Sequence, residues 1–114
     1  MSIRVTPAAL PEHLAGRPFA YVVSVGENGP KVVAQVCQVA DGRVSVADVG
    51  RGTAANVERD PRVTVVWPPV DVPVNDLDRY SLIADGVARA EPGDDGHVDL
   101  VIEVSGAILH RPAV

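Results

Sequence analysis

The sequence has 114 residues and a net charge of −5 at neutral pH, and 46% of its residues are hydrophobic. This length allows one domain with one core over residues 1–114, and the apolar fraction excludes a disordered chain. Because the net charge is negative and Lys31 is the only lysine, the charge balance argues against a basic face that binds nucleic acid, and we expect no such partner. No apolar stretch approaches the ~20 residues of a membrane-spanning helix, so we expect no membrane association. A single cysteine, Cys37, and the lack of a signal-peptide pattern predict a cytoplasmic location.

The first predicted elements are a short helix and a strand. Thr6-Pro7 joins a capping hydroxyl to a proline whose φ already suits a helix, which predicts a short helix within residues 7–15. Apolar side chains on both alternating sets then predict a strand over residues 19–25.

Two hairpin signals follow this strand. Asn28-Gly29 and Asp41-Gly42 tolerate the positive φ angles of tight turns. They bound strands that we expect over residues 31–39 and 43–49. Three strands joined by two short turns predict an antiparallel meander.

The second half of the chain predicts one more helix and three more strands. A short helix is expected over residues 53–59, with Thr53 or a neighbour as its cap, and Asp60-Pro61 should end it. The strands are expected over residues 62–67, 80–90 and 98–109, with a bulge at Asp85-Gly86. The predicted fold is therefore mainly β, a six-stranded antiparallel barrel with one N-terminal helix and one helix after strand three. Closure into a barrel would remove the exposed strand edges of this valine-rich chain.

The segment from Arg43 to Val63 resembles a known family. Its strand, glycine-containing loop, short helix, Asp60-Pro61 and following strand are similar to the FMN-binding split β-barrels of the pyridoxamine 5'-phosphate oxidase-like superfamily. The preceding hairpin (residues 19–36) and the segment 82–88 are similar to the flanking strands of that family. The chain ends soon after its last predicted strand, so we expect it not to be pyridoxamine phosphate oxidase itself, whose C-terminal substrate-binding residues would be missing.

This resemblance implies a homodimer that holds a flavin in a groove at the interface between the subunits. It implies no catalytic side chain, because in such proteins the flavin performs the redox chemistry. By position, the implied cofactor-binding residues are Val33, Ala34, Gln35, Val36, Val46, Ala47, Arg51, Gly52, Thr53 and Ser81.

The residues around Gly52 support an anion site on physical grounds as well. The N-terminus of a helix carries unpaired N–H groups and a partial positive charge. Gly50 and Gly52 allow close approach of the backbone, Arg51 can hold a phosphate with two hydrogen bonds, and Thr53 can donate a hydroxyl. We therefore expect FMN, or alternatively the deazaflavin F420, bound by a small oxidoreductase.

Two other functions remain open at this stage. Where the family carries a lysine, this chain has Gly52-Thr53, and Lys31 stands in place of an arginine. This motivates a dimeric binding or scaffold domain that has lost its flavin and holds no cofactor. An unrelated barrel for an apolar ligand is the third alternative; there the proline-rich stretch 68–77 would be a lid, whereas in the other two it would be a dimer contact.

Three residues near the end of the chain could suggest a metal site, and Cys37 could suggest a reactive thiol. Asp94, Asp95 and His97 are expected to be solvated in a short acidic turn, so no metal is predicted. Cys37 has no basic neighbour in sequence that would lower its pKa, and we expect it to be a buried strand residue.

Overall fold

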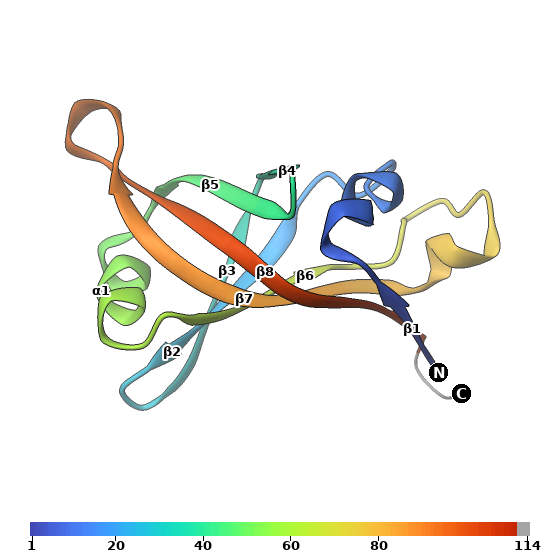
Figure 1. Cartoon of the computed structure of the whole chain (residues 1–114), viewed down its shortest axis with the longest axis horizontal. Coiled ribbons are helices and arrows are strands. Elements are labelled where there is room, and N and C mark those ends of the chain that lie inside the picture. Colours follow the sequence, from blue (N-terminus) through green and yellow to red (C-terminus); the bar gives the residue numbers. More distant parts are fainter. Residues whose placement is uncertain (112–114) are drawn as a thin grey trace.

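The computed structural model describes residues 1–111, and antiparallel strands dominate it (Figure 1). One α-helix and three short 3₁₀ helices lie between the strands: η1 (Pro7–His13), α1 (Arg51–Arg59), η2 (Asp76–Arg79) and η3 (Asp94–Gly96). The strands are β1 (Ser2–Val5), β2 (Ala20–Gly26), β3 (Gly29–Gln35), β4 (Cys37–Ala40), β5 (Arg43–Val49), β6 (Arg62–Trp67), β7 (Ser81–Pro92) and β8 (Val98–His110).

The strands form one sheet that curls back on itself. Its order is β3-β2-β6-β7-β8-β5-β4, so the two outermost strands, β3 and β4, are consecutive in the chain. Only Val36 separates them, and the barrel therefore closes at this corner through the chain rather than through a strand ladder. On one edge of β8, β5 pairs with the first half and β1 with the second half.

The structure has eight strands where the sequence predicted six, and each addition has a local cause. The predicted strand over residues 31–39 divides at Val36, because its first part pairs with β2 and its second part with β5. β1 was missed because it is four residues long and buries only Val5. Its partner is the far end of the chain, with Ser2 opposite His110.

Both predicted helices are present, with different boundaries or geometry. The helix expected over residues 53–59 begins at Arg51, and Gly50 rather than Thr53 is its N-cap residue. The N-terminal helix is a 3₁₀ helix with Pro11 inside it. A proline there lacks the N–H that a continuous α-helix would need.

The hairpin turn at Asp41-Gly42 and the bulge are confirmed, whereas the turn predicted on Asn28-Gly29 falls on Glu27-Asn28, because Gly29 already pairs with Gly26 and Asn28 does not take a positive φ. Asp41 and Gly42 have φ of 53° and 74°, the positive values that a tight hairpin between β4 and β5 requires. The pairing of β7 with β8 shifts between Asp85 and Gly86, where Ser105 is the additional residue. This bulge bends the two longest strands of the sheet.

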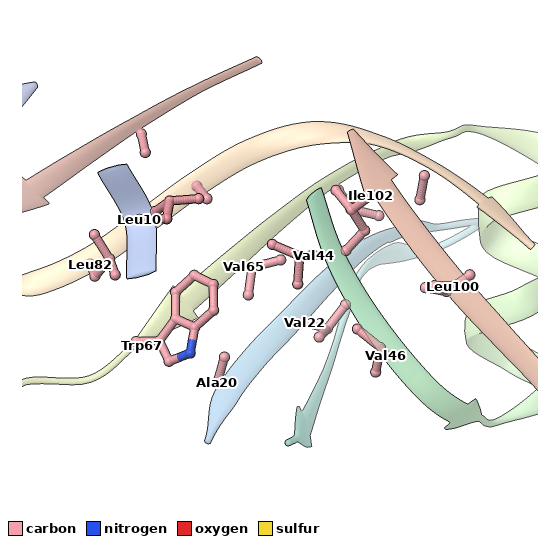
Figure 2. Packing of buried hydrophobic residues seen from close by; sticks show 14 of the residues in the cluster. Leu10, Ala20, Val22, Val44, Val46, Val65, Trp67, Leu82, Leu100 and Ile102 are labelled. Atoms are coloured by element: carbon pink, nitrogen blue, oxygen red, sulfur yellow. The ribbon is translucent and has the colours of Figure 1, made fainter. Parts of the chain in front are cut away.

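The core lies between the two halves of the curled sheet and consists mainly of valine and leucine (Figure 2). Trp67 from β6 is 1% exposed and fills one end of it, next to Leu10 from η1 and Leu82 from β7. Val46 lies in the middle of the core although its neighbours on β5 are exposed. Trp67 is therefore a core residue.

A buried arginine fastens the end of the barrel away from α1. Arg17 is 7% exposed, and burial lowers the pKa of its guanidinium, which donates four hydrogen bonds to main-chain carbonyl groups. The acceptors are the carbonyl oxygens of His13 (2.9 Å), Pro68 (2.8 Å), Leu77 (3.0 Å) and Tyr80 (2.7 Å). These bonds join η1 to both ends of the connection between β6 and β7.

Among residues 1–111, no helix has the length and apolar character of a membrane span.

Candidate functional site

The N-terminus of α1 is open to an anion. Gly50 is its N-cap residue and offers no side-chain hydrogen bond, and the first turn contains no acidic residue. The first amides of a helix have no intrahelical partners and carry a partial positive charge. Aspartate or serine at this cap would satisfy them, whereas here they stay available to a ligand.

Lys31 on β3 lies directly over this helix terminus. A Cβ placed on Gly52 would collide with the Nζ atom of Lys31, so only glycine fits here without displacing the lysine. Within the described residues, no carboxylate forms an ion pair with the Lys31 ammonium. The structure thus brings a side-chain cation and the helix amides to the same place.

Buried polar contacts hold α1 against β2 in this position. Asn56 is 8% exposed, and its Nδ2 atom donates to Ser24 Oγ at 3.0 Å. Arg59 donates to the carbonyl oxygen of Val25 (2.9 Å) and to Asn56 Oδ1 (3.2 Å). Because Ser24 pairs with Lys31 across the hairpin, the same anchor fixes the lysine relative to the helix.

Thr53 in the first turn of α1 is an unusual buried group. It is 1% exposed, and its hydroxyl has no hydrogen-bond partner in the described part of the chain. Leaving a buried hydroxyl unpaired costs about 1–3 kcal/mol. Buried hydroxyl groups without a partner are rare in native proteins, so Thr53 marks the first turn of α1 as unusual.

Arg51 lies on another side of the helix terminus from the Gly52–Lys31 contact. It lines a hollow of about 560 Å³ between α1 and the β7–β8 loop, together with Asp48, Glu58, Asp95 and His97. Three carboxylates therefore share this hollow with one guanidinium and one imidazole.

Asp48 precedes the helix and is fixed by two contacts. It has φ of 53° at an irregularity in the pairing of β5 with β8. Its N–H donates to Asp99 Oδ1 at 2.9 Å, and its Oδ1 atom lies 2.9 Å from His97 Nδ1. These contacts hold the carboxylate of Asp48 on the side of the β7–β8 loop.

A groove lies on the outside of the barrel where β3 turns into β4. Its volume is about 530 Å³, and four of the residues implied by the resemblance line it: Gln35, Val36, Val46 and Ala47. Gln38, Ser45, Glu91 and Asp99 add polar groups that the sequence did not point to. Lys31 and Gln35 are four residues apart on β3, which corresponds to about 13 Å along an extended strand.

The other implied residues fall into three groups. Val33 packs partly against the core on the same strand as Lys31, and Ala34 is exposed opposite Tyr21 on the other side of β3. Gly52 and Thr53 lie at the helix terminus, as described above. Ser81 is at the beginning of β7, opposite His110, at the end of the sheet where β1 pairs, and the structure does not bring it near α1 within one chain (Figure 1).

The residue that sequence reasoning undervalued is Lys31. Its position matches an arginine of the family, which is a signal, but a lone residue on a strand gives no indication of what it reaches. Burial raises the pKa of the Cys37 thiol to about 11, which keeps it protonated at neutral pH. Among residues 1–111, no group of three or more His, Cys, Asp or Glu side chains could hold a metal ion.

Comparison with known proteins gives relatives at the levels of both sequence and fold. No family model matches the sequence. Two proteins named only as uncharacterized, from Mycobacterium bovis and Mycobacterium tuberculosis, are each 34% identical to it over 119 residues. The match covers 93% of this chain and 77% of each relative.

Three solved structures illustrate the likeness in fold. A protein from Listeria innocua, provisionally named a pyridoxamine 5'-phosphate oxidase, has a TM-score of 0.69 at 15% identity over 90% of this chain and 96% of its own. An FAD-binding protein from Mesorhizobium loti has a TM-score of 0.69 at 14% identity over 97% and 98%. An F420 reductase has a TM-score of 0.55 at 19% identity over 90% and 93%.

The fold is the split β-barrel found in the pyridoxamine 5'-phosphate oxidase-like superfamily, as the resemblance in the sequence predicts. By sequence, the chain belongs to the family of the two mycobacterial proteins.

Proposed function

We propose that this protein binds FMN as a homodimer, with the phosphate at the N-terminus of α1 and the flavin ring along the groove beside β3 and β5. The observation that carries the proposal is the Lys31 ammonium lying over Gly52, where a Cβ would meet Nζ unless the flexible lysine side chain moved away. A cation without a carboxylate partner, placed at uncapped helix amides, is the environment that stabilises a phosphate group.

The spacing of the two features suits a flavin mononucleotide. The phosphate position at Lys31 and the groove at Gln35 are separated by about 13 Å along β3. A ligand with an anionic group at one end, a flexible chain, and a flat ring at the other end can span this separation. Val36 and Ala47 would offer the ring an apolar surface, and Gln35 would offer it hydrogen bonds, whereas Val46 is fully buried beneath the groove.

Charge favours a ligand with one phosphate over a longer cofactor. FAD carries a second phosphate, and F420 carries a phosphate followed by glutamates. Beyond the Lys31 position, the hollow beside Arg51 contains the carboxylates of Asp48, Glu58 and Asp95, which would repel further negative charge. FMN is therefore the flavin that fits the described charges best, with F420 as the alternative.

A bound flavin would supply hydride and electron transfer, so the proposed activity is that of a small flavin-dependent oxidoreductase. The roles left to this chain are to bind the phosphate, to orient the ring and to exclude water from one of its faces. Likeness in fold to an FAD-binding protein and to an F420 reductase supports a flavin-type ligand.

Titration with FMN, followed by quenching of the flavin fluorescence, tests the proposal. Riboflavin, FAD and F420 are titrated in parallel. We expect saturation at one FMN per chain, with riboflavin bound at least about tenfold more weakly, because a charge-assisted phosphate contact contributes about 1.5–3 kcal/mol. Tighter binding of F420 than of FMN would contradict the choice of cofactor. No saturation with any of the four at about 50 μM would instead favour the cofactor-free binding domain.

A further inference from the structure

β5 leaves its regular pairing with β8 just before α1 begins. At this point β5 has two residues, Ala47 and Asp48, where β8 has only one, Asp99. This arrangement is a β-bulge, and Asp48 has a positive φ of 53° within it. A positive φ is uncommon outside glycine and persists where the surrounding contacts hold it. The bulge lies two residues before Gly50, the N-cap residue of α1, so whatever holds it also directs the chain into the helix.

The side chain of Asp99 holds the main chain of this bulge. Its Oδ1 atom accepts a hydrogen bond from the N–H of Asp48 at 2.9 Å. A hydrogen bond to a charged acceptor is stronger than one between neutral groups. Gly93 leaves room for the carboxylate, because a Cβ at this position would lie 2.7 Å from Oδ1 and 2.9 Å from Oδ2 of Asp99. Alanine at position 93 would therefore displace the carboxylate of Asp99 without altering Asp99 itself.

A second contact to Asp48 comes from the loop between β7 and β8. The Oδ1 atom of Asp48 lies 2.9 Å from Nδ1 of His97, and both side chains are exposed. An exposed ion pair contributes little, because water and salt screen it. This contact fixes the carboxylate of Asp48 rather than its main chain. The hydrogen bond to Asp99 acts on the main chain directly, so it is the contact that sets the course of β5.

Strand pairing does not explain the charge of Asp99. Asp99 lies directly opposite Glu91 in the pairing of β7 with β8, and like charges in this position are unfavourable. Glu91 forms an ion pair with Arg89 at 3.0 Å, whereas Asp99 forms none with any of the described residues. An asparagine at position 99 would keep the acceptor for the N–H of Asp48 and remove the repulsion. The charge of Asp99 and its hydrogen bond can therefore be separated by substitution.

Asp99 also connects the two parts of the proposed FMN site. Its side chain lines the groove that we assign to the ring. Asp48, which it holds, lines the hollow at the N-terminus of α1 together with Gly50. The second half of α1 is anchored separately, because Asn56 donates a hydrogen bond to Ser24 on β2. The first turn of α1 thus depends on the bulge of β5 for its position.

We propose that Asp99 is a positioning residue, which holds the bulge at Asp48 and so fixes the phosphate site at the N-terminus of α1 relative to the ring groove. This inference rests on the proposed function. The phosphate contacts are those of the helix amides and Lys31, and Asp99 acts on them through Asp48. Its negative charge, by contrast, opposes an anion at the helix terminus. Removal of the side chain should therefore weaken FMN binding if position decides, and strengthen it if charge decides.

The test titrates the full chain and four variants with FMN and with riboflavin. Asp99→Ala removes the acceptor and the charge, Asp99→Asn removes only the charge, and Gly93→Ala displaces the carboxylate. Asp94→Ala is the matched control, because Asp94 is an exposed aspartate of the same loop that lines neither the groove nor the hollow. Amide hydrogen exchange at Ala54, whose N–H donates to the carbonyl oxygen of Gly50 at 3.0 Å, measures the order of the first turn without a ligand. Thermal unfolding shows whether each variant is folded.

In Asp99→Ala we expect FMN to bind about fivefold more weakly, riboflavin to stay within about twofold of wild type, and exchange at Ala54 to be about fivefold faster. Asp99→Asn should bind FMN at least as tightly as wild type and should be at least as stable to heat. Gly93→Ala should change in the same direction as Asp99→Ala. Asp94→Ala should stay within about twofold of wild type for both ligands.

A folded Asp99→Ala variant that binds FMN as tightly as wild type, or that loses equal affinity for FMN and riboflavin, would overturn the positioning role. An Asp99→Asn variant as weak as Asp99→Ala would overturn it too. Wild-type protein that binds neither ligand, or both equally, would refute the proposed function instead. In that case, faster exchange at Ala54 in Asp99→Ala would leave the positioning of α1 standing, and unchanged exchange would refute it as well.

Discussion

The two ends of the barrel each contain a basic side chain that reaches across from one segment to another, and they differ in what these side chains meet. Arg17 is buried and donates to four main-chain carbonyl groups. Lys31 is exposed, lies over the N-terminus of α1, and forms no ion pair within residues 1–111. The hydrogen-bond donors of Arg17 are satisfied by its own chain, whereas Lys31 has no ion-pair partner within the described residues.

This difference separates a structural cation from the one that we propose to bind a phosphate. The hydrogen bonds of Arg17 leave little capacity for a ligand, and they join η1 to both ends of the β6–β7 connection. At the α1 end, the amides of the first turn and the hydroxyl of Thr53 are unsatisfied as well. Unsatisfied polar groups are therefore gathered at the α1 end of the molecule, and each end can be perturbed independently of the other.

The largest effect should come from Arg17→Met. This change leaves four carbonyl groups without their donor and should lower the free energy of unfolding by about 3 kcal/mol. FMN affinity of the folded protein should stay within about twofold of wild type, because the α1 end is untouched. Arg17→Lys keeps the charge but not the forked geometry, so its free energy of unfolding should lie between that of the wild type and that of Arg17→Met. Urea denaturation measures the free energy of unfolding. A loss below about 0.5 kcal/mol for Arg17→Met would contradict a structural role for Arg17.

Gly52→Ala should act in the opposite direction on stability and on binding. Alanine in the first turn stabilises a helix by up to about 1 kcal/mol relative to glycine, but its Cβ would displace the Lys31 ammonium. We expect FMN affinity to fall about tenfold while the unfolding midpoint stays level or rises. Gly50→Ala is the control, because nothing lies within 4 Å of a Cβ at that position. Equal losses of affinity in both variants would show that the contact with Lys31 is unimportant.

A smaller effect is expected from Asp48→Asn. Asp48 is two residues before Gly50, so its carboxylate opposes an anion at the helix terminus even though it faces His97. Removing one such charge should strengthen FMN binding about threefold at low salt, and less at high salt. Asp71→Asn makes the same charge change on the β6–β7 connection and should leave binding unchanged. Equal gains in both variants would point to net charge rather than to position.

The sequence was most informative where local signals decide the structure. Asp41-Gly42 has the positive φ angles of the hairpin it predicted, and the bulge at Asp85-Gly86 is in place. Local signals could not predict β1, since its pairing with β8 joins the two ends of the chain. The division of one predicted strand at Val36 depends on which edge of the sheet each half joins, which is also a long-range property.

The same limit applies to the candidate site. Gly52 and Arg51 were chosen from their position before a helix, which is a local pattern. The reach of Lys31 to Gly52 and the four acceptors of Arg17 join residues far apart in sequence, so neither can be seen in a local pattern. The side of the helix that Arg51 faces depends likewise on where α1 packs against the sheet.

The most direct test of the central claim compares FMN with riboflavin, which lacks the phosphate, in the wild type and in Lys31→Ala by titration calorimetry. If Lys31 binds the phosphate, the variant should lose about tenfold or more in FMN affinity and nothing in riboflavin affinity. Lys31→Arg should recover most of the loss, and the free energy of unfolding should change by less than about 0.5 kcal/mol in both variants. Wild-type affinity for FMN in Lys31→Ala, or an equal loss for both ligands, would contradict a phosphate site at the N-terminus of α1.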